Sequence, residues 1–290
     1  MKKEKSNHIM KILKFISIIG VLLFTACGKQ KDDSDLSDFN LSGNVKSTKE
    51  ISYEAVEKFG EIEKGEKFTG INIERIFNKE GNQIEEKKYN SNGSLNLKTT
   101  YKYDEGGKLV EKNVYNSDDN LEEKVTYKYD KEGNRVEKKK YNSDSSLWVK
   151  LTYKYDDEGN CVEANGYDSN GNLSLKRIYK YDEEGNRVEE KEYDSDGSLK
   201  EKVTFKYGVE GNLVEKKEYE SDDNLEEKVT YKYNDKGNRV EEKKYNSNFS
   251  LYKKRTYKYD YDKEGNWITK IEFEDDIPRH VIERKIEYFN

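Results

Sequence analysis

The sequence has little histidine, cysteine and proline, and these shortages narrow the chemistry that it can perform. His8 and His280 are its only histidines, and it has two cysteines and one proline among 290 residues. No histidines and cysteines have the spacing of a metal site, and neither a glycine-rich phosphate loop nor a serine–histidine pair is present. We therefore expect no enzymatic activity, no cofactor and no bound metal.

Apolar residues are also scarce. The hydrophobic set makes up 32% of the chain and charged residues make up 39%, a balance that normally indicates disorder. Two features argue against disorder here, namely 24 tyrosines and a strict internal repeat. The composition predicts a thin, folded structure with a large polar surface and no deep core.

The one long apolar run is near the N-terminus, and it predicts a targeting segment. Phe15 to Phe24 is too short to span a bilayer as a helix, and Lys11 and Lys14 precede it. The run ends at Leu-Phe-Thr-Ala-Cys (23–27), which resembles the lipobox of bacterial lipoproteins. The resemblance implies that residues 1–26 are a signal peptide and that Cys27 becomes the acylated, palmitate-bearing first residue. The alternative is an ordinary secretory peptide with an incidental cysteine.

The expected mature chain is acidic. Residues 1–26 hold five of the 54 basic and one of the 60 acidic residues, so their removal leaves a net charge of −10. This disfavours nucleic acid as a partner. Polar residues 27–43 predict a flexible tether. Within it, Lys31-Asp32-Asp33 resembles an export signal of surface lipoproteins, although a solvated spacer explains it equally well. We expect a lipid-anchored protein of the cell envelope, in the outer membrane.

A 26-residue unit organises the rest of the chain. Its turn glycine recurs every 26 residues from Gly81 to Gly237, and the next copy, Gly265, follows after 28 residues because Tyr261-Asp262 is added. Such a fixed period is the signature of a repeat architecture. We divide the chain into an N-terminal capping hairpin (44–80), tandem repeats (81–264) and a C-terminal capping hairpin (265–290).

Each unit predicts two strands and two turns. In residues 121–129 apolar and aromatic side chains alternate with polar ones, as in a half-exposed strand. Asp130 to Gly133 has the composition of a type I turn closed by a glycine, which explains these acidic turns without calcium. Short connections join antiparallel neighbours. The predicted fold is all-β: a long, twisted, single-layer meander of about 18 strands, roughly 80 Å long and open at both ends.

The turns also predict which residues pair. Tyr129 should face Arg135, Tyr127 should face Glu137, and Arg135 should lie between the rings of Tyr129 and Tyr153. One face would then carry all the tyrosines. Val136 has the opposite parity to Tyr141, so either a β-branched stripe follows the second face or a bulge in the return strand brings both residues onto one face. We favour the stripe.

Three resemblances accompany this pattern. The Tyr-x-Tyr-Asp-x-x-Gly-Asn core, as in 127–134, resembles the YD repeats of Rhs-type proteins over roughly residues 71–274. That family is built of β-hairpin units, and many of its members bind carbohydrate or encase a toxin. The segment 193–199 resembles MORN-like repeats of antitoxin-type lipoproteins, and the Lys/Glu-rich meander is similar to the single-layer sheets of spirochaetal surface lipoproteins.

We therefore expect a non-enzymatic surface binding or scaffold protein, anchored in the membrane through the lipid on Cys27. Tyrosine rows offer apolar area with polar tips, which suits a glycan or a protein ligand. The alternative is an immunity protein that neutralises a toxin. The predicted binding face consists of Tyr101, Tyr103, Tyr127, Tyr129, Tyr153, Tyr155, Tyr179, Tyr181, Tyr231 and Tyr233.

Overall fold

The computed structural model describes residues 35–290, and most of them are in β-strands. In this range the only helix is the short 3-10 turn η1 (Ser37–Phe39), so no helix there is long and apolar enough to span a membrane. The strands are β1 (Val45–Lys58), β2 (Glu61–Phe77), β3 (Gln83–Tyr89), β4 (Leu95–Tyr103), β5 (Leu109–Asn116), β6 (Leu121–Tyr129), β7 (Arg135–Asn142), β8 (Leu147–Tyr155), β9 (Cys161–Tyr167), β10 (Leu173–Tyr181), β11 (Arg187–Asp194), β12 (Leu199–Tyr207), β13 (Leu213–Glu220), β14 (Leu225–Tyr233), β15 (Arg239–Asn246), β16 (Leu251–Tyr261), β17 (Trp267–Glu274) and β18 (Ile277–Tyr288).

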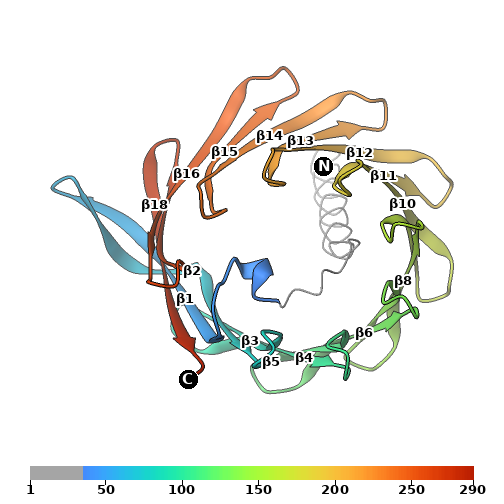
Figure 1. Cartoon of the computed structure of the whole chain (residues 1–290), viewed down its shortest axis with the longest axis horizontal. Coiled ribbons are helices and arrows are strands. Elements are labelled where there is room, and N and C mark those ends of the chain that lie inside the picture. The colour runs from blue at the N-terminus through green and yellow to red at the C-terminus, as the bar shows by residue number, and fades with distance from the viewer. Residues whose placement is uncertain (1–34) are drawn as a thin grey trace, which may run out of the picture.

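The eighteen strands form one antiparallel sheet that closes on itself. Strands that follow one another in the chain pair side by side, and β1 pairs with both β2 and β18. The result is a ring of strands around an interior (Figure 1). The prediction of an all-β antiparallel sheet is confirmed, but the prediction of an open ribbon is wrong, because the first and last strands pair with each other.

A bulge in each return strand is one physical reason for the closure. Tyr129 pairs with Arg135 as predicted, whereas Tyr127 pairs with Lys138 instead of Glu137. Val136 is therefore an extra residue in β7. The same shift occurs in the corresponding pairs of the other units. The expectation of a β-branched stripe through Val136 is therefore wrong, and the alternative, a bulge in the return strand, is present.

A second bulge follows at the other turn of each unit. Tyr141 pairs with Leu147 but Lys140 pairs with Val149, so Trp148 is the extra residue. Equivalent shifts recur along the chain. A bulge bends its strand and increases the local twist. With two bulges in each unit the curvature accumulates until β18 reaches β1.

The bulges also divide the tyrosines between the two faces. An extra residue reverses the alternation of all side chains that follow it. Tyr141 consequently pairs with Lys124, on the face opposite to that of Tyr127. The expectation that one face carries all tyrosines is therefore wrong. On the outer face lysines lie over the rings of the return-strand tyrosines, namely Tyr115, Tyr167, Tyr219 and Tyr245.

The turns have the predicted chemistry. The backbone N–H of Asn134 donates to Asp130 Oδ1 at 2.7 Å, and Gly133 has a φ of +94°. At the second turn the same left-handed position is occupied by glycine in some units and by Phe249, with a φ of +62°, in another. The turn residues of the repeat are thus explained by local backbone geometry.

Residues 35–43, which were expected to belong to the tether, lie inside the ring, and the far ends of β1 and β2 extend outside it (Figure 1). The inner segment has a small apolar core, in which Leu36 and Leu41 pack with Val45 and Phe77. A second buried cluster, around Leu151, lies elsewhere in the sheet. The segments assigned as caps, 44–80 and 265–290, lie side by side through the β1–β18 pairing. Cys27 lies outside the described residues.

Candidate functional site

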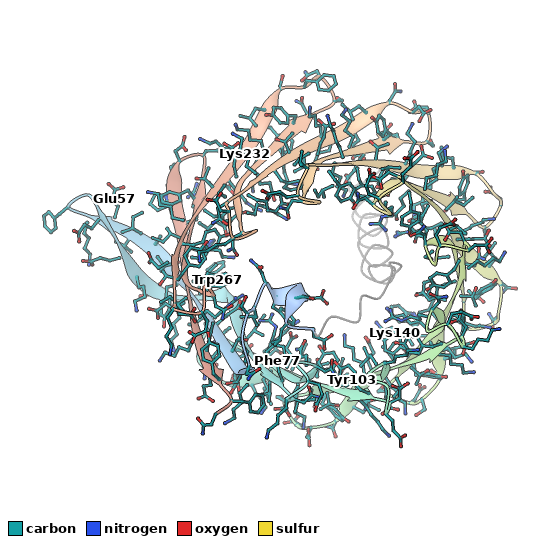
Figure 2. The ribbon with its side chains drawn as sticks, viewed as in Figure 1. Glu57, Phe77, Tyr103, Lys140, Lys232 and Trp267 are labelled. Carbon is teal, nitrogen blue, oxygen red and sulfur yellow. The ribbon has the colours of Figure 1, made fainter. Side chains whose placement is uncertain are left out.

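The ten tyrosines of the predicted binding face lie on the inner face of the ring. Tyr103 fixes this assignment, because its hydroxyl donates to Asp35 Oδ2 of the inner segment at 2.6 Å. The other nine occupy equivalent positions of the repeat. Tyr153 and Tyr179 are buried and the rest are partly buried, so none projects freely into solvent. Figure 2 shows Lys140 and Trp267 on the same side of the wall.

The second tyrosine of most Tyr-x-Tyr pairs has a structural role. Tyr155 donates its hydroxyl to the backbone carbonyl of Arg135, twenty residues earlier, at 2.7 Å. The same bond, at 2.7–3.1 Å, is made by Tyr103, Tyr129, Tyr181, Tyr207 and Tyr259. These hydroxyls satisfy carbonyls at the start of the preceding return strand. They join one unit to the next and are not available to a ligand.

Arginines at the start of the return strands cover the first tyrosine of the pair. The guanidinium of Arg135 lies 4.6 Å from the ring centre of Tyr127 and 5.8 Å from that of Tyr129. Sequence reasoning predicted Tyr129 correctly, but Tyr127 takes the place predicted for Tyr153. Both bulges account for the difference. The extra residue Val136 brings Arg135 beside Tyr127, and the extra residue Trp148 shifts the register of β8 so that Tyr153 no longer faces Arg135.

Burial raises the pKa of the inner tyrosines. The pKa of Tyr127, Tyr155 and Tyr181 rises to about 12 in each case, mainly because the phenolate would lose its hydration. These phenols are therefore neutral at physiological pH. The charge of the inner wall is set by its arginine, lysine and glutamate side chains.

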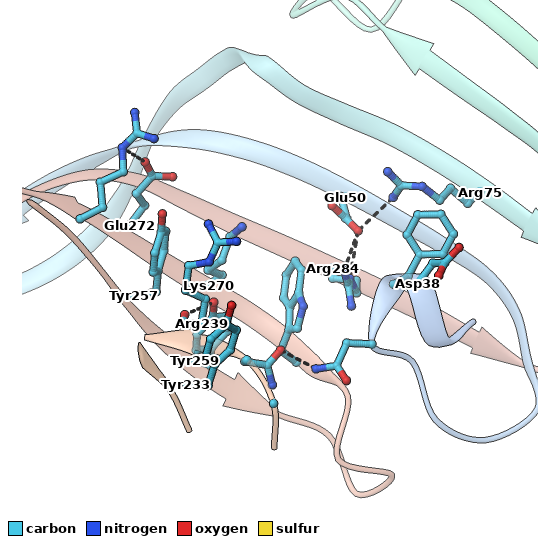
Figure 3. A pocket seen from close by; sticks show the side chains of 16 residues that line it. Asp38, Glu50, Arg75, Tyr233, Arg239, Tyr257, Tyr259, Lys270, Glu272 and Arg284 are labelled. Carbon is cyan, nitrogen blue, oxygen red and sulfur yellow. Dashed lines mark hydrogen bonds and ion pairs between the residues drawn. The ribbon is translucent and has the colours of Figure 1, made fainter. Parts of the chain in front are cut away.

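A cavity of about 530 Å³ opens on the inner wall where η1 meets β14 to β18 and the first two strands (Figure 3). Its aromatic lining consists of Phe39, Tyr233, Tyr257, Tyr259 and Trp267. Its charged lining consists of Asp38, Glu50, Arg75, Arg239, Arg255, Lys270, Glu272 and Arg284. Only Tyr233 belongs to the binding face predicted from the sequence.

The inner segment is fixed to the wall at two distant places. At one end Asp35 Oδ2 accepts hydrogen bonds from the backbone of Gln83 and from Tyr103, at 2.7 and 2.6 Å. At the other end Asn40 donates to Asn238 at 2.9 Å. The side of the cavity that the inner segment forms is therefore held in place by hydrogen bonds at both ends.

A buried ion cluster lies beside η1, where the ring of Phe39 packs on Arg75 with 4.6 Å between the guanidinium and the ring centre. Glu50 Oε1 accepts from Arg75 Nη1 at 3.1 Å and from Arg284 Nε and Nη2 at 3.0 and 2.9 Å. Arg284 stacks on Trp267, with the guanidinium 3.5 Å from the ring centre. The remaining nitrogen, Nη1, is buried and has no hydrogen-bond partner, a condition that costs about 1–3 kcal/mol. Burial also lowers the pKa of Arg284.

Lys270 lines the same wall and has no close counterion. It is partly buried, and within residues 35–290 no carboxylate forms an ion pair with it. Its ammonium group lies 5.4 Å from the ring centre of Trp267 and 5.9 Å from that of Tyr257. Burial lowers the pKa of Lys270; attraction from Glu50 and Glu272 opposes this effect, and repulsion from Arg284 and Arg239 adds to it.

The cavity residues that sequence reasoning missed are departures from the repeat. Trp267 occupies the position that Arg135, Arg187 and Arg239 hold in other units. Arg255 likewise replaces the valine found at Val229. Both exceptions were visible in the sequence. Glu50 and Arg284 lie in the segments assigned as caps, where no repeat position identifies them. Among the described residues no group of three or more histidine, cysteine, aspartate or glutamate side chains could hold a metal ion.

No family model matches the sequence, and no curated protein matches it significantly. Solved structures resemble the fold distantly. A porin-like protein from Bacteroides uniformis aligns over 84% of this chain and 96% of its own, with 13% identity and a TM-score of 0.43. A porin-like protein from Bacteroides vulgatus aligns over 66% and 94%, with 12% identity and a TM-score of 0.40. The Photorhabdus luminescens Tc holotoxin pore aligns over 74% of this chain but only 15% of its own, with 11% identity and a TM-score of 0.23.

Proposed function

We propose that this chain is a non-enzymatic binding protein of the cell envelope, anchored through a lipid on Cys27, which holds a glycan in the cavity on its inner wall. The cavity of about 530 Å³ is the observation that supports the proposal most strongly. Its volume falls within the range of small-ligand sites, roughly 300–1,000 Å³. A site of this size suits a small molecule or the end of a chain rather than a folded protein.

The chemistry of the lining favours a sugar. Tyr257 and Tyr259 provide aromatic faces against which the apolar side of a sugar ring can stack, and the buried Trp267 lies against Tyr259, with ring centres 6.3 Å apart. Charged groups beside them, such as Glu272 and Arg255, can exchange hydrogen bonds with hydroxyls. The rest of the tyrosine rows has a structural part to play, because the second member of most pairs already bonds a carbonyl.

Glycan-array binding of the mature protein tests the proposal, with each hit followed up by titration. The variant Trp267→Ala should lose at least tenfold in affinity. Trp148→Ala is the matched control, because Trp148 is the only other tryptophan and does not line the cavity. The proposal fails if no glycan binds, or if Trp148→Ala and Trp267→Ala weaken binding equally.

The alternative, an immunity protein that neutralises a toxin, is a second proposal. It rests only on the resemblance to antitoxin-type repeat lipoproteins. A toxin gene beside the gene for this chain, and rescue of growth on co-expression, would support it. An unrelated gene neighbourhood would remove its basis.

A further inference from the structure

Two cationic side chains on one wall of the cavity have bonding capacity that no neighbour uses. Glu50 Oε1 accepts hydrogen bonds from both Arg75 and Arg284, and Arg75 has a second counterion in Glu86, at 3.2 Å. Nη1 of Arg284 makes no hydrogen bond, although the residue is more than nine-tenths buried. Lys270, which also lines the cavity, forms no ion pair with any residue in 35–290. The ammonium group of Lys270 is thus the charge on this wall that is left without a direct partner.

The strand register places the two cations next to each other. Lys270 of β17 pairs with Ile282 of β18, and Arg284 is two residues further along on the same face. Cross-strand diagonal neighbours of this kind are within reach of long side chains. Trp267 contacts both, at 3.5 Å from the guanidinium of Arg284 and 5.4 Å from the ammonium of Lys270. An indole face and two positive charges therefore meet at one point.

The other cations of the cavity lining have carboxylate partners. Glu272 lies 3.5 Å from Arg255, Arg239 pairs with Glu242 at 2.7 Å, and Arg284 pairs with Glu50 at 2.9 Å. Lys270 is therefore the one cation of the lining that forms no ion pair among residues 35–290.

We propose that the cavity selects an acidic saccharide, whose carboxylate or sulfate group contacts Lys270 beside Arg284 while its ring lies on the aromatic wall. This inference rests on the proposed glycan-binding function and adds the charge of the ligand. Lys270 makes the direct contact, since its side chain is only partly buried. Arg284 adds positive charge from within the wall, where its guanidinium stacks on Trp267. Charge-assisted hydrogen bonds of this type are stronger than neutral ones.

Three matched probes test the inference on the mature protein: methyl β-D-glucuronide, methyl β-D-glucoside 6-sulfate and the neutral methyl β-D-glucoside. The readout is the indole N–H signal of Trp267, and that of Trp148 is the internal control, since the chain has two tryptophans. We expect both acidic probes to shift the Trp267 signal in a saturable way, at least tenfold more tightly than the neutral probe. The Trp148 signal should not move. Whichever acidic probe binds more tightly identifies the carboxylate or the sulfate as the preferred anion.

The variants are chosen so that the fold survives. Lys270→Met keeps the length of the side chain and breaks no ion pair within the described residues. It should reduce the affinity for the acidic probes to that for the neutral one, and Lys270→Arg should retain most of it. Arg284→Gln is avoided, because it would remove the ion pair with Glu50 that joins β18 to β1.

The outcomes separate the two proposals. Equal binding of the neutral and acidic probes, or unchanged affinity in Lys270→Met, overturns the acidic subsite and leaves a neutral glycan site standing. If no saccharide shifts the Trp267 signal and no array glycan binds, the proposed function fails together with this inference.

Discussion

Glu50 and Arg284 lie directly opposite each other where the first and last strands of the ring pair. Glu50 Oε1 accepts from Nε of Arg284 at 3.0 Å, across 234 residues of sequence. The same carboxylate oxygen accepts from Arg75 of β2, so one side chain holds β18, β1 and β2 together. The closure of the sheet thus has a buried ion cluster at its centre.

Glu50→Gln should lower the free energy of unfolding by about 3–5 kcal/mol, because it leaves the buried guanidinium of Arg284 without its counterion and removes one of the two carboxylates that pair with Arg75. Urea denaturation followed by circular dichroism measures the change. The control is Glu287→Gln at the exposed pair with Lys46, 3.9 Å apart, which should change stability by less than about 1 kcal/mol. Similar losses in the two variants would contradict a central role for Glu50.

Tyr155→Phe should cost about 0.5–1.5 kcal/mol of stability, because it removes the hydrogen bond to the carbonyl of Arg135. Tyr179→Phe should cost nothing or stabilise slightly, because the buried hydroxyl of Tyr179 has no partner. Urea unfolding of the two variants makes a matched comparison. A larger loss in Tyr179→Phe would show that the hydroxyl ladder does not join the units.

Low pH should destabilise the folded protein by protonating the repeated glutamates of the outer face. A side-chain hydrogen bond from Lys154 is the main cause that lowers the pKa of Glu163 to about 2, with Lys176 and Asn165 contributing, against the opposing effect of burial. A carboxyl whose pKa is lower in the folded state stabilises the fold above its unfolded pKa of about 4.5. That stability is lost as the pH falls from about 4.5 towards about 2.

Thermal unfolding between pH 7 and pH 2 tests this expectation. The melting temperature should fall steadily below about pH 4.5, and less steeply in Glu163→Gln, which lacks the titrating group. Neighbouring lysines lower the pKa values of four equivalent carboxyl groups in the same way, namely Glu137, Glu189, Glu215 and Glu241. The fall in melting temperature of the wild-type protein is therefore the sum of contributions from several glutamates. Identical pH profiles for the two proteins would contradict the contribution of Glu163.

Phe249→Gly should stabilise the fold by up to about 1 kcal/mol. Phe249 has a φ of +62°, in a region that costs a residue with a Cβ atom roughly 1–2 kcal/mol. Its side chain is 61% exposed, so little packing is lost. Phe249→Ala is the control, because alanine keeps the strain. Chemical denaturation should give the glycine variant a larger free energy of unfolding than the wild-type protein and the alanine variant. A less stable glycine variant would show that the ring of Phe249 makes a stabilising contact.

The strands and turns were predictable because each is specified by a few neighbouring residues. Alternation from Leu121 to Tyr129 indicates a strand, and Asp130 with Gly133 indicates the turn that ends it. The same local rules apply to every 26-residue unit, so they also predict the number of strands. They also place Tyr129 opposite Arg135 correctly.

The closure was not predictable from such rules. An extra residue such as Val136 or Trp148 resembles any other strand residue, yet it reverses the faces and bends the sheet. The pairing of Glu50 with Arg284 depends on the curvature summed over all units. The cavity was therefore missed, although the exchange of arginine for tryptophan at 267 marks the place.

The pairing of β1 with β18 has a consequence for how the protein is made. During translation β1 emerges among the first strands, and β2 can pair with it soon afterwards, but its other edge has no partner until β18 has been synthesised. Unpaired edges recruit strands from other chains. The nascent chain therefore carries an unpaired, aggregation-prone strand edge for most of its synthesis. A chaperone that shields β1 would favour correct folding over aggregation.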